Sequence, residues 1–223
     1  MPDPKPFPLH IGVLVVGGIQ LLDLSPIDLF AMLTTDYLKA CNLPPAITSH
    51  GIPSSELKIT YIASTGAGSL APTTPNLKFH IDAGLDDESV KPGKLDILMI
   101  PGPDPNKVPE EPALEFLRKH VEKGVEVLTI CTGIFVAGHA GILDGKNATG
   151  GREIVDMMLK KQFPKAKWRD DVRWTTDEKL WTAGGITNGQ DMVAAYIRKR
   201  WPGTLSETVC KLADVGDRGQ YYP

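Results

Sequence analysis

The chain has 223 residues, of which 42% are hydrophobic and 23% charged, and its formal net charge at pH 7 is −3. This size suits one α/β domain, so we expect a single unit over residues 1–223, with its core over about 9–200 and a C-terminal helix and tail over 204–223. The slightly acidic balance and the lack of a basic cluster argue against a nucleic-acid partner.

The cysteine content and the N-terminus predict a cytoplasmic protein. Three scattered cysteines are too few for a disulfide framework, and the odd count suits a reducing compartment. The opening MPDPKPFPLH lacks the charged and then apolar layout of a signal peptide. No apolar run approaches the ~20 residues of a membrane span, so no membrane partner is expected.

Hydrophobic periodicity and turn residues predict strands that alternate with helices. In chain order we expect a strand at 10–16, a helix from Ser25 to about Leu38, strands at 58–64, 77–83 and 95–100, a helix at 111–124, a strand at 125–130, a helix from Thr132 to about Leu143, a strand at 147–149, a helix at 152–163, a hairpin of 168–174 and 179–182, and helices at 188–200 and 204–214.

This alternation predicts an α/β fold with a mostly parallel, doubly wound sheet. Ligands of such sheets bind beyond the carboxyl ends of the strands. Three loops are predicted at those ends, and they carry Asp23, Gly102 and Cys131.

Cys131 lies where an apolar strand meets a helix, in VLTICTGIFVAGHAGI. A sharp strand-to-helix turn exposes its side chain, as in a nucleophile elbow. The free N–H groups of a helix N-terminus favour a thiolate, so we expect the pKa of the thiol to fall. The alternative is a buried structural cysteine.

Asp23 interrupts the apolar IQLLDL just after the first strand. If it meets Cys131, the two groups share a proton, and Asp23 becomes a general acid and base. Its alternative role is to cap the following helix. The backbone N–H groups of Gly102 and Thr132 are candidates for an oxyanion-type hole, although Gly102 also suits a plain turn.

No metal or cofactor is expected. The five histidines do not pair with each other or with a cysteine at metal-ligand spacing, and no phosphate-binding glycine motif is present. The AGGIT stretch predicts a tight turn between a strand and a helix, where Gly185 could line a pocket or serve only the turn.

The sequence resembles the ThiJ/PfpI superfamily in CTG followed by AGHAGILDGKNAT, in AGGITNGQD and in the IPGP loop. The segments LLDLSPIDLF and TAGGIT are most similar to its isonitrile hydratase branch. This resemblance implies a flavodoxin-like three-layer sandwich, usually a homodimer. It also implies that Cys131 is the nucleophile, that Asp23 is its acid and base, and that Gly102 and Thr132 donate backbone N–H groups.

One position departs from the family pattern. Many members carry a histidine 20 residues after the cysteine, where this chain has Gly151. Glycine there leaves room beside the pocket, and Arg152 next to it could bind an anionic substrate group or simply be solvated. A Cys–His dyad is therefore not expected.

These observations favour a cofactor-independent enzyme that adds water to a small isonitrile by attack of Cys131. One alternative keeps the residues and changes the reaction, to glyoxalase-like chemistry on a 2-oxoaldehyde or to a tailoring isomerase or lyase. Another is a thiol sensor in which Cys131 oxidises to a sulfinic acid.

Overall fold

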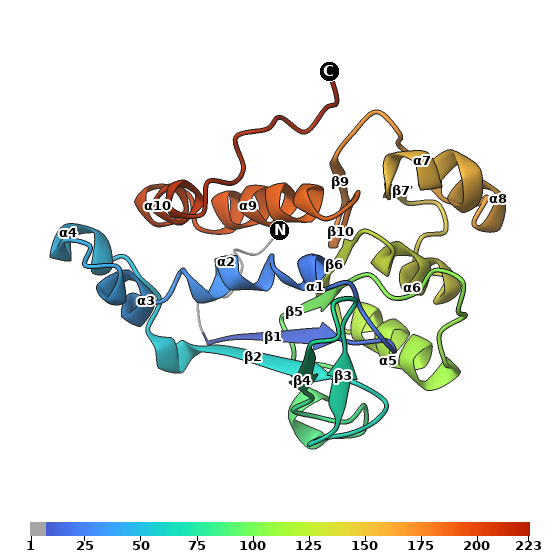
Figure 1. The fold of residues 1–223 in the computed structure, drawn as a ribbon, viewed down its shortest axis with the longest axis horizontal. Coiled ribbons are helices and arrows are strands. Elements are labelled where there is room, and N and C mark those ends of the chain that lie inside the picture. Colours follow the sequence, from blue (N-terminus) through green and yellow to red (C-terminus); the bar gives the residue numbers. More distant parts are fainter. Residues whose placement is uncertain (1–7) are drawn as a thin grey trace.

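The computed structural model describes residues 8–223. Residues 1–7 lie outside the described residues. They form most of the N-terminal stretch for which no signal peptide is predicted. The centre is a six-stranded sheet with the order β2-β1-β5-β6-β10-β9 (Figure 1). Neighbouring strands pair in parallel, except that β9 runs antiparallel to β10. The strands are β1 (Leu9–Leu14), β2 (Leu57–Ile62), β5 (Ile97–Ile100), β6 (Glu126–Ile130), β9 (Trp174–Asp177) and β10 (Leu180–Ala183).

Helices cover both faces of the sheet, as Figure 1 shows. The side chains of β5 alternate between the two cores: Ile97 and Met99 belong to one, and Leu98 and Ile100 to the other. A strand buried on both faces is a continuous apolar run, which explains the LDILMI pattern. The first core includes α2 (Ile27–Ala31), α9 (Thr187–Arg200) and α10 (Thr204–Leu212), and the second includes α5 (Glu111–Glu122) and α6 (Gly133–His139). The predicted flavodoxin-like three-layer sandwich is confirmed.

None of the helices within residues 8–223 has the length and apolar character that a membrane crossing needs.

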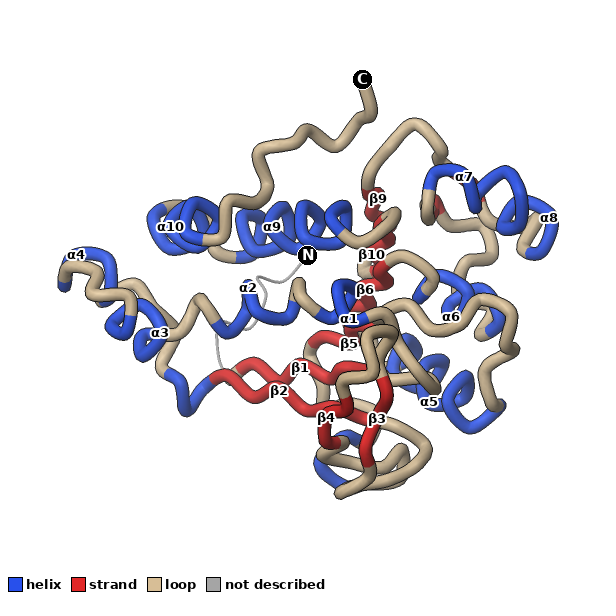
Figure 2. Tube along the Cα trace, viewed as in Figure 1, coloured by secondary structure: helices blue, strands red, loops and turns tan. Residues whose placement is uncertain are grey.

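The helix predicted from Ser25 to about Leu38 is not continuous, because this segment forms two short helices, α2 and α3 (Thr35–Ala40) (Figure 2). The hydroxyl of Ser25 donates to the Leu22 carbonyl at 2.6 Å, and that of Thr34 donates to the Ala31 carbonyl at 2.8 Å. Such local bonds compete with a continuous helix. A further short helix, α1 (Leu21–Leu24), precedes Ser25.

Several predicted elements are shorter than expected or pair elsewhere. The strand predicted at 77–83 is reduced to β4 (Lys78–His80), which pairs with β3 (Leu70–Pro72) in a separate two-stranded sheet. The first half of the predicted hairpin, at 168–174, is divided, since β8 (Lys167–Trp168) pairs with β7 (Asn147–Ala148) and only β9 joins the main sheet. The remaining elements are α4 (Pro45–Thr48), α7 (Arg152–Ile154), a π-helical segment (Val155–Leu159), α8 (Lys160–Gln162), and 3₁₀ turns at Ser54–Glu56 and Glu88–Val90.

The parallel pairing places the carboxyl ends of β1, β5, β6 and β10 at one edge of the sheet. The segments that follow these ends carry Asp23, Gly102, Cys131 and the Gly184–Ile186 loop. The candidate site is built from these four segments.

Candidate active site

Cys131 forms a tight elbow between β6 and α6. Its φ is +54°, a left-handed conformation that is uncommon outside glycine. Its N–H donates to the carbonyls of Ala183 at 3.2 Å and Gly184 at 3.1 Å, which ties the elbow to the end of β10. A Cβ on Gly133 would collide with the carbonyl oxygen of Ile100, so only glycine lets α6 begin this close to β5. These features match the geometry of a nucleophile elbow.

Asp23 is fully buried at 0% exposure. Burial raises the pKa of its carboxyl group to about 7, because the charged form is poorly solvated. Hydrogen bonding from the Cys131 thiol and from the N–H groups of Gly102 and Ile186 lowers this pKa in part. Among the described residues, neither carboxyl oxygen has a partner with full hydrogen-bond geometry, so we regard these three contacts as weak.

The thiol of Cys131 behaves opposite to the prediction that its pKa would fall. Burial, and then the negative charge of Asp23, raise the pKa of Cys131 to about 11. The N–H groups of Thr132 and Ile186 lower that pKa, but by less. The helix-terminus argument therefore fails, because desolvation and a neighbouring carboxylate outweigh the N–H groups. The pair holds a proton at neutral pH.

Gly102 and Thr132 come together beside this pair. A Cβ on Gly102 would overlap both Oδ2 of Asp23 and Oγ1 of Thr132, so the close approach requires glycine. The Thr132 hydroxyl donates to the Pro103 carbonyl at 2.7 Å, and the Gln20 N–H donates to the Gly102 carbonyl at 3.0 Å. The backbone N–H of Gly102 lowers the pKa of Asp23, and the backbone N–H of Thr132 lowers the pKa of Cys131.

Ile186 is a member of the site that the sequence analysis missed. This β-branched residue has a φ of +35° and a ψ of −87°, a conformation that is rare for such side chains. Such backbone strain costs on the order of 1–3 kcal/mol and clusters at functional sites. The Ile186 N–H lowers the pKa of both Asp23 and Cys131, which places it beside both groups. The preceding glycine pair was the only local signal for it.

The other predicted binding residues are Gly185, Gly151 and Arg152, and their role in binding stays a prediction. Gly185 precedes Ile186 and has open space where a Cβ would stand. The three atoms nearest to a Cβ on Gly151 would all belong to the Ile154 side chain, at 3.2 to 3.8 Å, so a side chain at this position would press against Ile154. Arg152 is exposed, and its guanidinium carbon lies 4.5 Å from the centre of the Tyr222 ring.

Within residues 8–223, no cluster of three or more His, Cys, Asp and Glu side chains could hold a metal ion. Two surface hollows, of about 140 and 930 Å³, include neither Cys131 nor Asp23. The chemistry available at the strand ends is therefore that of a thiol, a carboxyl group and several backbone N–H groups.

Known proteins share this arrangement of elements. The model of the DJ-1/PfpI family matches residues 34–199. Isonitrile hydratase of Pseudomonas putida is 31% identical over 186 residues, which cover 82% of this chain and 68% of that protein. The crystal structure of Drosophila melanogaster DJ-1beta superposes with a TM-score of 0.70 at 15% identity, over 93% of this chain and 98% of that one. An AraC family transcriptional regulator from Pseudomonas putida gives a TM-score of 0.71 at 14% identity, over 92% and 99% of the two chains. The family match covers most of the chain, which therefore belongs to the DJ-1/PfpI family.

Proposed function

We propose that the protein is a cofactor-independent cysteine enzyme that hydrates a small isonitrile to an N-formamide. The observation that carries the proposal is the pairing of the Cys131 thiol with the buried carboxyl group of Asp23, whose pKa of about 7 suits proton transfer near neutral pH. The similarity to an isonitrile hydratase supports the choice of substrate class.

The reaction proceeds in two covalent stages. Asp23, as carboxylate, accepts the thiol proton while the sulfur of Cys131 attacks the terminal isonitrile carbon. The same carboxyl group then donates the proton to that carbon, giving a thioimidate in which the carbon carries hydrogen, sulfur and a double bond to nitrogen.

Water completes the reaction. Asp23 takes a proton from the attacking water and passes it to the substrate nitrogen, and a tetrahedral adduct forms on the sulfur. The carbon–sulfur bond breaks as the carbonyl forms, and the hydroxyl proton returns to the thiolate by way of Asp23. The net change is one isonitrile and one water to one N-formamide. The N–H groups beside the pair, those of Gly102, Thr132 and Ile186, stabilise negative charge that develops during these steps.

The test is turnover of an isonitrile panel, with the formamide detected by NMR. Cys131→Ala should abolish turnover, and Cys41→Ala should leave it unchanged, because Cys41 lies at the C-terminal end of α3 and not among the four segments. Intact mass of the trapped wild-type enzyme should show one substrate-sized adduct on Cys131. Full activity of Cys131→Ala would contradict the covalent mechanism.

The same residues also support a different substrate, a 2-oxoaldehyde or an isomerase or lyase substrate. Running 2-oxoaldehydes in the same panel distinguishes these enzymes by their products. The role of a thiol sensor is less favoured, because a pKa of about 11 leaves little thiolate for oxidation at neutral pH.

A further inference from the structure

The segment after α10 returns across α9 toward the strand ends (Figure 1). Residues 219–222 run alongside the segment that leads into β9. Val172 and Tyr221 form an antiparallel bridge, the Arg173 N–H donates to the Gln220 carbonyl at 2.7 Å, and the Tyr222 N–H donates to the Asp171 carbonyl at 3.1 Å. We call residues 214–223 the C-terminal tail.

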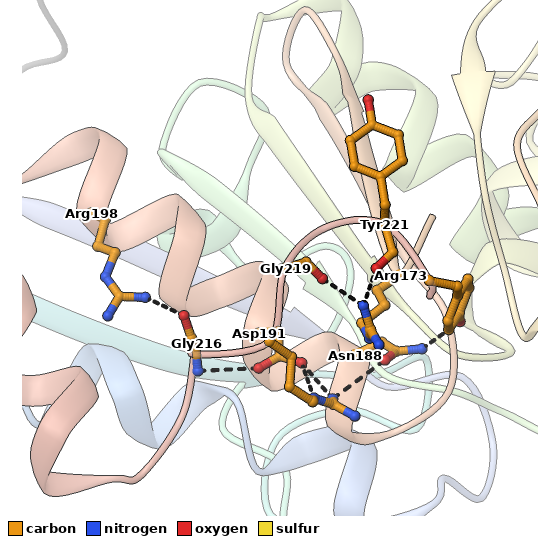
Figure 3. A network of polar contacts seen from close by, with 9 residues as sticks. Arg173, Asn188, Asp191, Arg198, Gly216, Gly219 and Tyr221 are labelled. Atoms are coloured by element: carbon orange, nitrogen blue, oxygen red, sulfur yellow. Dashed lines mark hydrogen bonds and ion pairs between the residues drawn. The ribbon is translucent and has the colours of Figure 1, made fainter. Parts of the chain in front are cut away.

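Polar contacts, some partly buried and some exposed, hold the tail in this place (Figure 3). The carboxylate of Asp191, which is 4% exposed, accepts from the Gly216 N–H at 3.1 Å and from the Nε of Arg218 at 2.7 Å. Arg198 donates to the Gly216 carbonyl at 2.7 Å. Arg173 donates to the Gly219 carbonyl at 2.7 Å and also to the Tyr221 carbonyl. A tail held by this many bonds to α9 and to the β9 segment has one defined path.

This path places Tyr222 over the glycine turn after β10. Two guanidinium groups lie over its ring, with the central carbon of Arg152 at 4.5 Å and that of Arg173 at 4.9 Å from the ring centre. Its hydroxyl accepts from the Nδ2 of Asn188 at 2.8 Å. A Cβ on Gly184 would stand 3.3 Å from this hydroxyl and 2.7 Å from the Asn188 amide nitrogen, so the turn packs directly against both groups.

The glycine turn in turn holds the nucleophile. The Gly184 carbonyl accepts from the Cys131 N–H at 3.1 Å, and the Gly184 N–H donates to the Arg173 carbonyl at 2.9 Å. The Asn188 N–H donates to the Gly185 carbonyl at 2.9 Å. Ile186, between these residues, presents its N–H to the thiol and the carboxyl group. A continuous set of contacts therefore joins Tyr222 to the reacting pair.

We propose that Tyr222 is a positioning residue for the Cys131 site, which acts through Asn188 and the Gly184–Ile186 loop to fix the backbone groups that face the thiol. The part of this proposal that concerns turnover rests on the proposed function. The part that concerns the reactivity of the thiol does not.

The test compares Tyr222→Phe with Tyr221→Phe. Tyr221 is the matched control because it lies next to Tyr222 on the same tail, is 61% exposed, and uses its carbonyl to hold Arg173. Each variant is assayed for kcat/KM on an isonitrile and for the pH dependence of Cys131 alkylation by iodoacetamide, read by peptide mass mapping. Circular dichroism and thermal melting confirm that both variants fold.

For Tyr222→Phe we expect kcat/KM to fall about fivefold to tenfold, the equivalent of one lost hydrogen bond. We also expect the alkylation profile to move to higher pH, because a displaced Ile186 N–H no longer favours the thiolate. Tyr221→Phe should stay within about twofold of the parent in kcat/KM and keep the parent alkylation profile.

An unchanged alkylation profile in Tyr222→Phe, with or without a lower melting temperature, would overturn the proposal, as would equal changes in both variants. If the parent itself hydrates no isonitrile, the proposed function fails, and the alkylation profiles still decide the role of Tyr222.

Discussion

Replacing Asp23 by asparagine should move the reactivity of the thiol and the turnover in opposite directions. The substitution keeps the shape of a fully buried side chain and removes its ability to carry charge and exchange protons. Asp23→Asn therefore isolates the electrostatic part of the Cys131 site. Asp28→Asn is the matched control, since Asp28 is exposed on the next helix.

The magnitude for the thiol follows from its pKa. With a pKa of about 11, about one Cys131 in a thousand is ionised at pH 8. After burial, the negative charge of Asp23 is the next largest cause of the raised pKa of Cys131, so removing that charge lowers the pKa. Each unit by which the pKa of Cys131 falls increases the fraction of thiolate tenfold. Alkylation of Cys131 at pH 8 should accelerate in Asp23→Asn. Turnover should fall by roughly 10²–10⁴-fold, because the general acid and base is lost.

The stability of the same variant provides an independent measurement. The pKa of Asp23 is about 7 in the folded protein and 3.8 in its unperturbed state, so the folded state retains a proton that the unfolded chain has lost between about pH 4 and pH 7. Ionising the buried group then costs stability, which falls as pH rises through this window and reaches a penalty of up to about 4 kcal/mol above pH 7. Urea denaturation should find Asp23→Asn more stable than the parent at pH 8, with the advantage much smaller at pH 4.5.

Three results would refute this reasoning. They are slower or unchanged alkylation of Cys131 in Asp23→Asn, turnover within twofold of the parent, and a stability difference that does not change with pH. Asp28→Asn should match the parent in all three assays.

Further predictions concern the same centre. Gly102→Ala should destabilise the fold by about 1–3 kcal/mol and reduce turnover at least tenfold, since the new Cβ overlaps Asp23 and Thr132; an equal melting temperature and rate would contradict this packing. The pH profile of kcat/KM should rise through about pH 7 as Asp23 becomes able to accept the thiol proton, and a profile that falls there would exclude the base role. Gly151→Ala should change stability by less than about 1 kcal/mol in thermal melts, because the three atoms nearest to the new Cβ all belong to the Ile154 side chain; a larger loss would contradict this packing. The homodimer implied by the family resemblance predicts twice the chain mass in light scattering, and a single-chain mass would contradict it.

The sequence was sufficient for the sheet and for the meeting of three site residues. LDILMI is apolar at every position but one, and VEVLTI sends apolar side chains to both cores, because their strands are covered on both faces. This pattern makes the parallel sheet predictable from the sequence. The rule that binding residues follow the carboxyl ends of such strands then brought Asp23, Gly102 and Cys131 together.

The rest depends on contacts between distant segments. The thiol pKa was predicted in the wrong direction because desolvation is a property of the assembled core, whereas the helix terminus is visible locally. The break between α2 and α3 lies beside Thr34, whose hydroxyl donates to the Ala31 carbonyl three residues back, an option that the pattern leaves open. Tyr222 lies 34 residues after Asn188, and nothing in YYP indicates that one tyrosine faces a glycine turn and the other faces solvent.

The gap between the two pKa values has a consequence for the proposed reaction. With Asp23 near 7 and Cys131 near 11, the thiol keeps its proton at neutral pH while the carboxyl group can be ionised. On the proposed mechanism, the sulfur of Cys131 becomes a strong nucleophile only during the reaction. Asp23 removes the thiol proton as the sulfur bonds to an electrophilic carbon. A resting thiolate would react with peroxide and with many electrophiles, whereas this pair becomes reactive only with a substrate that also accepts the transferred proton. An isonitrile carbon accepts the sulfur and the proton on the same atom, and this property matches a thiol and a carboxyl group held side by side.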